Sequence, residues 1–209
     1  MPRAFSEEER ARAKARLFEA GKRLINAMGV RRLVVDDVAR EAGISKGSFY
    51  AFFPSREDFI LSVFEAWEAE YRGELIRSVA EGTGNARERL ERFFRGAFDL
   101  LEREPGLARL GSADIQTLID RLPSERLAAH QAADSDVLRE TLERWIDAGL
   151  IRNDAAEAFR GVFTAIFSIA MRRADFPAGE YAPAVRLISE ALALRFAPAE
   201  AGEEADHGK

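Results

Sequence analysis

The sequence predicts an all-α fold with about nine helices. Apolar residues recur at spacings of three and four along most of the 209 residues. No stretch combines alternation of period two with β-branched residues, which is the pattern of a strand. Prolines fall where helices are expected to begin or end. A core of helices packed on helices satisfies all three observations.

The first expected helix is long and amphipathic and ends at Met28. Ser6 and Glu9 have the spacing of a capping box, and Gly29 follows where a helix end favours glycine. Four basic residues lie on the outer face near its start: Arg10, Arg12, Lys14 and Arg16. They are expected either to reach a phosphate backbone or to form an ordinary solvated face.

Residues 34–53 have the pattern of a helix-turn-helix. A short helix places its apolar residues on one face and ends at Gly43, which tolerates the positive φ of a helix terminus. Ser45 is a suitable N-cap for a second helix. Three aromatic residues then return to the same core: Phe49, Phe52 and Phe53. An ordinary helical hairpin fits the same spacing.

The charge distribution favours a nucleic-acid-binding interpretation of this motif. Residues 1–56 carry 12 Lys and Arg and 7 Asp and Glu, a net charge of +5, whereas residues 57–209 carry 19 and 29, a net charge of −10. A basic N-terminal part joined to an acidic remainder indicates a polyanion-binding domain attached to a part that does not bind polyanions. The outer side of the second helix is then expected to lie in a major groove.

A fourth helix is expected to start at the capping pair Ser55 and Asp58 and to continue to Glu81. Glycines at positions 82 and 84 break it. Five further helices are expected at residues 86–104, 107–122, 124–148, 154–175 and 181–196.

The last two helices are apolar on nearly every side, so every side must be buried. We expect a second copy of the chain to cover them in a four-helix dimer interface. The alternative is a central core helix within one chain. The residues expected in the interface are Phe163, Ile166, Phe167, Ala170, Ile188 and Leu192.

The first sixty residues resemble the TetR family of bacterial transcriptional regulators. The likeness is carried by residues 35–59, V-D-D-V-A-R-E-A-G-I-S-K-G-S-F-Y-A-F-F-P-S-R-E-D-F, whereas the rest resembles the family only in architecture. The resemblance implies a homodimer that binds a palindromic double-stranded DNA operator and is released by a small-molecule effector. It implies a DNA-binding domain at 1–56 and a ligand-binding and dimerisation domain at 57–197. The acidic residues 198–209 are expected to be disordered.

The resemblance also implies which residues face DNA. They are Lys46, Gly47, Ser48, Tyr50, Ala51, Phe52 and Arg56. The family commonly has Thr or Ser where this chain has Val34, and His, Tyr or Trp around Ala51 and Phe52. Few groups are left for direct base reading. We therefore expect Lys46, Tyr50 and Arg56 to contact mainly phosphates, while Ser48, apolar contacts and DNA deformability supply selectivity.

Enzymatic and metal-binding interpretations find little support. Residues 43–47 match the G-x-S-x-G pattern of a hydrolase, but a helix and not a strand is expected before Ser45. His130 and Asp134 are one helical turn apart and can bind a metal or a polar group of a ligand, although a lone histidine on a helix is more often structural. We expect no catalytic residue, no metal and no cofactor.

An effector pocket is expected among aromatic and apolar residues of the later helices, with a few polar side chains. The candidates are Trp67, Phe94, Phe98, Trp145 and Phe163, with Gln116, His130 or Gln131 as polar groups. A mostly apolar or aromatic effector fits them best.

The chain has no cysteine, no signal-peptide pattern and no apolar run long enough for a membrane span, so we expect a cytoplasmic protein without membrane contact. The leading hypothesis is a ligand-responsive DNA-binding repressor. The alternative is an all-α small-molecule-binding protein or enzyme that has kept the fold without DNA binding.

Overall fold

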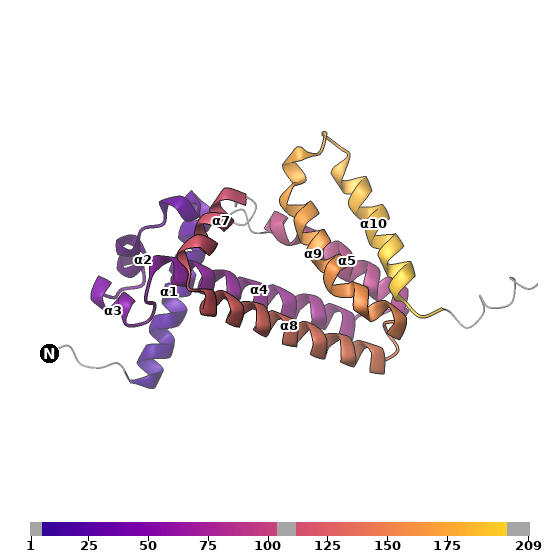
Figure 1. Ribbon diagram of the computed structural model, residues 1–209, viewed down its shortest axis with the longest axis horizontal. Helices are drawn as coiled ribbons and strands as arrows, with labels where there is room; N and C mark the ends of the chain where they lie inside the picture. The colour runs from indigo at the N-terminus through magenta and orange to yellow at the C-terminus, as the bar shows by residue number, and fades with distance from the viewer. Residues whose placement is uncertain (1–5, 104–111, 200–209) are drawn as a thin grey trace, which may run out of the picture. The chain divides into compact units, whose positions relative to one another are not determined.

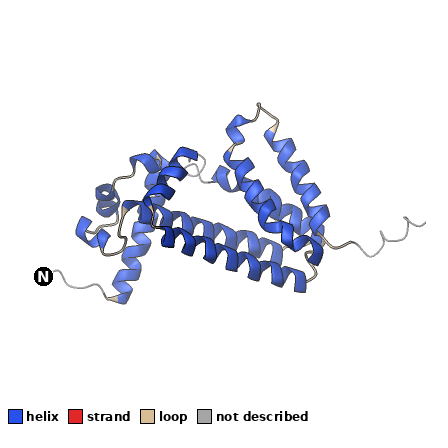
Figure 2. Ribbon diagram, viewed as in Figure 1, coloured by secondary structure: helices blue, strands red, loops and turns tan. Residues whose placement is uncertain are grey.

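The computed structural model describes residues 6–103 and 112–199. Within these ranges it contains nine α-helices, three short 3-10 helices and no strand, which confirms the all-α prediction (Figure 1 and Figure 2). The α-helices are α1 (Glu7–Met28), α2 (Val35–Glu41), α3 (Lys46–Tyr50), α4 (Arg56–Ala80), α5 (Ala86–Arg103), α7 (Ser112–Arg121), α8 (Ser124–Asp147), α9 (Ala156–Met171) and α10 (Tyr181–Phe196). The 3-10 helices are η1 (Val30–Arg32), η2 (Asn153–Ala155) and η3 (Arg173–Asp175). The expected helix start at 107 and the tail from residue 200 lie outside the described residues.

Helix α1 begins at the expected capping box. The Ser6 hydroxyl accepts a hydrogen bond from the Glu9 N–H at 3.2 Å, and the Glu9 carboxylate accepts one from the Ser6 N–H at 2.8 Å. The bond from the Ser6 backbone lowers the pKa of Glu9. The helix ends at Gly29, whose φ of 80° strongly favours a residue without a side chain.

The chain divides into two compact units. One unit takes the residues up to Glu70 together with Glu102–His130; the other takes Tyr71–Leu101 and the residues from Gln131 onward. This division follows packing, and the functional boundary expected at residue 56 stays a prediction.

The first unit has its core where α1, α2 and α3 pack against the start of α4. Leu17, Val38 and Phe59 are fully buried there. The close approach of α1 to α4 depends on Gly21, because a Cβ atom at this position would lie 2.7 Å from the Phe59 ring and 2.8 Å from Val63. Gly21 is therefore a packing residue.

The start of α8 is fastened to α4 within this unit by the guanidinium of Arg126. Arg126 donates to Asp58 Oδ1 at 2.8 Å and to Glu65 Oε1 at 2.7 Å. Hydrogen bonds to Glu65 and then Asp58 raise the pKa of Arg126 despite its partial burial. The same end of α4 shows the expected second capping pair, since Ser55 Oγ accepts from the Asp58 N–H at 3.0 Å.

The second unit is built around a cluster of aromatic side chains. Phe93 lies 5.0 Å from Trp145 and 5.9 Å from Phe159, measured between ring centroids. Phe159 in turn lies 5.4 Å from Phe196, which ends α10. These contacts join α5, α8, α9 and α10 into one core. No described helix is long and apolar enough to span a bilayer.

Candidate DNA-binding surface

Helix α3 is held to the first unit by one fully buried side chain. Phe49 packs its ring 5.6 Å from Phe53 and 5.1 Å from Phe59, between centroids. With this inner face anchored, the outer positions of α3 and its C-cap residue are exposed. The exposed residues are Lys46, Gly47, Tyr50 and Ala51, four of the seven predicted to contact DNA.

The corner between α2 and α3 has the predicted chemistry. Gly43 has φ of 68°, and the Ile44 N–H donates to the Ala39 carbonyl at 2.9 Å. The Ser45 hydroxyl accepts from the Ser48 N–H at 3.0 Å and caps α3. Ser45 therefore acts as a helix cap. Ser48, predicted to supply selectivity, is half-buried, and its hydroxyl lies 2.9 Å from that of Ser45.

Lys46 is the only charged residue on α3, and it is paired within the motif. Its Nζ lies 3.0 Å from Oδ2 of Asp36, on the first turn of α2. Both side chains remain more than half exposed, at 55% and 57%. The hydrogen bond and the negative charge of Asp36 raise the pKa of Lys46.

Helix α2 begins without a side-chain cap. Val34 occupies the N-cap position, makes no side-chain capping bond and is 48% exposed. Asp36 and Asp37 follow in the first turn, where negative charge favours a helix.

Phe52 is half-buried and covered by an arginine of α1. The guanidinium carbon of Arg10 lies 4.7 Å from the centre of the Phe52 ring, and the same side chain donates to the Ala51 carbonyl at 3.1 Å. Arg16 similarly donates from Nε to the Ala42 carbonyl at 2.8 Å. Arg10 and Arg16 belong to the four basic residues expected to reach phosphates or to form a solvated face. Instead, they donate hydrogen bonds to carbonyls at the C-terminal ends of α3 and α2. This use was not predicted.

The other two basic residues of that face contact side chains of their own helix. Arg12 pairs with Glu8 at 2.9 Å, and Lys14 lies 5.5 Å from the centre of the Phe18 ring. Both remain exposed.

Arg56 is bonded within the protein through its whole guanidinium. Its Nε donates to the Leu33 carbonyl at 2.7 Å, and one Nη donates to the Val30 carbonyl. The other Nη donates to Glu57 at 3.0 Å. Arg56 thus joins α4 to the segment before α2. Contact between Arg56 and a phosphate stays a prediction.

The expected pocket residues fall into two groups. Phe94, Phe98 and Trp145 are buried and Phe163 is half-buried in the second unit. Trp67 is buried in the first unit, where it stacks on Phe64 at 5.9 Å. The polar candidates Gln116 and Gln131 are exposed, and Gln116 donates to Asp120 at 2.7 Å. The aromatic part of the expected set therefore lies in the interior, while these two polar candidates lie at the surface.

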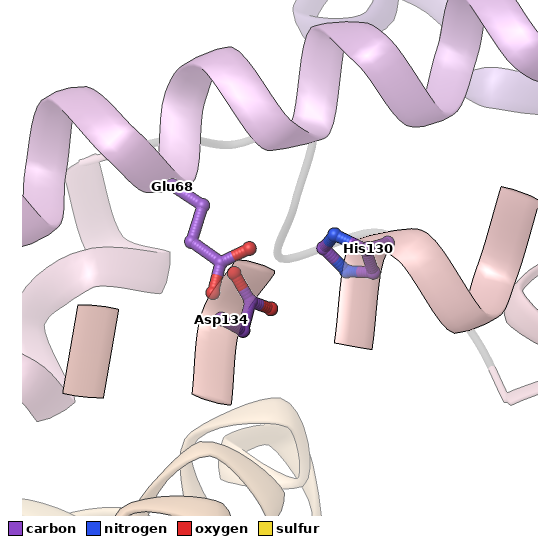
Figure 3. Close-up of side chains that lie close together, drawn as sticks. All are labelled: Glu68, His130 and Asp134. Atoms are coloured by element: carbon purple, nitrogen blue, oxygen red, sulfur yellow. The ribbon is translucent and has the colours of Figure 1, made fainter. Parts of the chain in front are cut away.

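Figure 3 shows the third polar candidate, His130, with Glu68 of α4 and with Asp134 one turn further along α8. Such side chains offer the nitrogen and oxygen donors that metal ions use. Two of them have other partners, however. His130 Nδ1 lies 3.3 Å from Glu65, and Asp134 accepts from Arg72 at 3.1 Å. These contacts give both side chains a partner within the protein.

The expected dimer residues are only partly exposed. Ile166 and Ala170 are buried within the second unit, which does not suit a direct contact with a second chain. Phe163, Ile188 and Leu192 are half-buried, and Phe167 is 42% exposed. The most exposed large apolar side chains of these helices are Leu187 and Leu194 of α10, at 67% and 55%. The sequence pattern identified the helices but did not single out these two residues.

Comparison with known proteins shows which proteins this chain is similar to. Residues 17–63 match the profile of the bacterial regulatory proteins, tetR family. The transcriptional regulator AcuR of Cereibacter sphaeroides is 32% identical over 95 residues, which are 46% of this chain and 41% of AcuR. The transcriptional repressor KstR2 of Mycobacterium tuberculosis is 23% identical over 138 residues, 66% of this chain and 68% of KstR2. This chain thus spans about two fifths of AcuR and two thirds of KstR2.

A solved structure supports the fold beyond the matched segment. The regulator FadR of Bacillus subtilis, in complex with stearoyl-CoA, has a TM-score of 0.55 and 20% identity, with 86% of this chain and 96% of FadR covered. At this identity the likeness concerns the fold alone. The profile match covers the helix-turn-helix described above, and both relatives are regulators of transcription. Residues 17–63 of this chain therefore match the helix-turn-helix segment of the bacterial regulatory proteins, tetR family, and the described residues share the fold of a solved regulator.

Proposed function

We propose that this chain is a repressor that binds a palindromic operator as a homodimer and leaves it when a small, mostly apolar effector binds. The observation that carries the DNA-binding part is the outer face of α3. It is fixed from behind by the buried Phe49 and exposes Lys46, Gly47 and Tyr50. A helix that is anchored on its inner face and carries small and polar side chains on its outer face is suited to binding in a major groove.

Gly47 gives this assignment independent support. A Cβ atom there would meet only Ser45 Oγ, at 3.8 Å, so packing within the chain does not require a glycine. Glycine also weakens a helix interior. A residue that is unfavourable for its helix and unnecessary for the fold is expected where a partner's atoms come close.

The effector part of the proposal rests on the second unit. The interior cluster around Phe93, Phe94 and Trp145 is aromatic, and no charged side chain is buried among the residues that the structure describes. A ligand that enters this core must be largely apolar, because burial of an unpaired charge is costly. The complex of FadR with stearoyl-CoA shows that a regulator with this fold can bind an acyl compound.

The test begins with selection of binding sequences from a random duplex library by the purified protein. The selected duplex and a mixed-sequence duplex are then compared by fluorescence anisotropy at rising salt. A regulator that neutralises several phosphates is expected to lose about 10³-fold in affinity between 50 and 200 mM salt. Selection without enrichment, and no binding at low salt, would leave the alternative of a ligand-binding protein with the fold alone.

The effector is sought separately by thermal-shift screening of a hydrophobic compound library. A compound that raises the melting temperature is expected to release the selected duplex as well. Stabilisation without release would contradict the proposed switch.

A further inference from the structure

The proposed DNA-facing surface contains a negative charge at an informative place. Asp36 lies on the first turn of α2, and its carboxylate pairs at 3.0 Å with Lys46, the only cation of α3. With its side chain 57% exposed, Asp36 is not required to fill the core. The acid therefore acts mainly through its charge, next to the residue predicted to contact phosphate.

We propose that Asp36 is a specificity-determining residue: its carboxylate holds and neutralises Lys46 and thereby weakens binding to DNA of arbitrary sequence. This inference rests on the proposed DNA-binding function. A phosphate that approaches Lys46 also approaches Asp36, so the attraction that drives non-specific binding is reduced. Only a duplex whose other contacts place a phosphate within reach of Lys46 draws it away from Asp36. Specificity gained by weakening the wrong complex is a general device of binding surfaces.

A competing explanation is that Asp36 merely stabilises α2. Negative charge favours the start of a helix, and Val34 provides no cap. The adjacent Asp37 separates the two explanations. It lies in the same first turn and carries the same charge, but its carboxylate pairs with Arg40 of α2 and not with α3. Loss of either charge affects the helix terminus, whereas only loss of Asp36 frees Lys46.

The experiment compares the full-length protein with D36N, D37N, K46A and the double variant D36N/K46A. Each is titrated with a mixed-sequence duplex of about 30 base pairs and with the duplex selected by the wild-type protein, at several salt concentrations. Circular dichroism and thermal melting of the free proteins establish that each variant is folded.

The expected result is that D36N binds the mixed-sequence duplex about two- to tenfold more tightly than the wild type. The slope of log K against log salt should steepen by about one to two units per dimer, since an additional cation engages phosphate in each protomer. The affinity ratio between selected and mixed duplexes should fall. D37N should leave that ratio unchanged, and the gain from D36N should shrink when Lys46 is replaced.

Two results would overturn the inference while the proposed function stands: equal mixed-duplex affinity for D36N and wild type, or the same gain from D37N. A gain from D36N that persists in full without Lys46 would also overturn it, because the carboxylate would then not act through that lysine. If the wild-type protein binds neither duplex at low salt, the proposed function fails and the inference fails with it.

Discussion

Arg56 donates a hydrogen bond from Nε to the Leu33 carbonyl oxygen at 2.7 Å, across 23 positions of the sequence. This bond, with the one to Val30, ties the first residue of α4 to the segment that leads into α2. Arg56 therefore helps to fix the position of the helix-turn-helix against the start of α4. The family resemblance implies a contact of the same side chain with a phosphate.

Replacement of Arg56 by alanine should lower the stability of the fold. Two main-chain carbonyls lose their partner, and we expect a loss of about 1–3 kcal/mol in the free energy of unfolding. Urea denaturation followed by circular dichroism measures it. K46A serves as the control, because Lys46 is exposed and its loss should change unfolding by less than about 0.5 kcal/mol. Equal stability of R56A and wild type would favour the phosphate role.

Glu57 should make stability depend on pH. Burial alone would raise its pKa, but its own backbone N–H and the guanidinium groups of Arg121 and Arg56 outweigh burial and lower it. The ionised carboxylate therefore stabilises the fold above the unfolded pKa of about 4.3, and this stability is lost as pH falls through the lower folded pKa. E57Q should cost about 1 kcal/mol at neutral pH and less at an acidic pH below the folded pKa, where the carboxyl is protonated. Urea midpoints at both pH values check this, and a constant difference would contradict it.

A hydroxyl at position 34 should stabilise α2. Val34 stands at the N-cap, is 48% exposed and makes no capping bond. V34T is expected to raise the free energy of unfolding by about 1 kcal/mol, and S45A, which removes the cap of α3, to lower it by a similar amount. Thermal melting compares the two. A V34T protein no more stable than wild type would indicate that Asp36 and Asp37 already satisfy the helix terminus.

Substitution of Gly47 by alanine should separate stability from DNA binding. The added Cβ would meet only Ser45 Oγ, at 3.8 Å, in the free protein, so unfolding should become about 0.5–1 kcal/mol less favourable. Affinity for the selected duplex should nevertheless fall at least tenfold, if duplex atoms come close to Gly47. Melting curves and anisotropy titrations of one preparation give both values. A stabilised variant with full affinity would remove Gly47 from the interface.

A charge on the exposed side of α10 should abolish self-association. L187E introduces a carboxylate at a side chain that is 67% exposed, so the free protomer should stay folded. Light scattering coupled to size exclusion should show a dimer for wild type and a monomer for the variant. I119E, on α7, changes a side chain 41% exposed and serves as the matched control. A dimeric L187E would place the interface elsewhere.

Local chemistry allowed much of this fold to be predicted from sequence. The capping pairs Ser6 with Glu9 and Ser55 with Asp58, and the turn at Gly43, all depend on residues within a few positions of one another. Such signals leave a mark in the sequence, because the interacting groups stand at fixed spacings. Helix limits that fall within the described residues were accordingly predicted to within about four residues, and those of α10 without error.

The partners of the arginines could not be predicted in the same way. Arg10, Arg16 and Arg56 bond to main-chain carbonyls 41, 26 and 23 positions away. A carbonyl acceptor is present at every residue, so no residue type marks the partner. The exposed side of α10 could not be predicted from the sequence either. A helix that is apolar on nearly every side does not show in its pattern which side packs against the same protomer.

The brevity of α3 sets a limit on what one copy of this chain can recognise. Five residues rise about 7 Å along a helix axis, close to two steps of about 3.4 Å along a duplex. In the proposed complex with DNA, α3 of one copy therefore contacts only a very short sequence, which recurs by chance throughout any genome. A few substitutions on this short helix are then expected to change the DNA sequence that the protein prefers, and with it the genes that it controls.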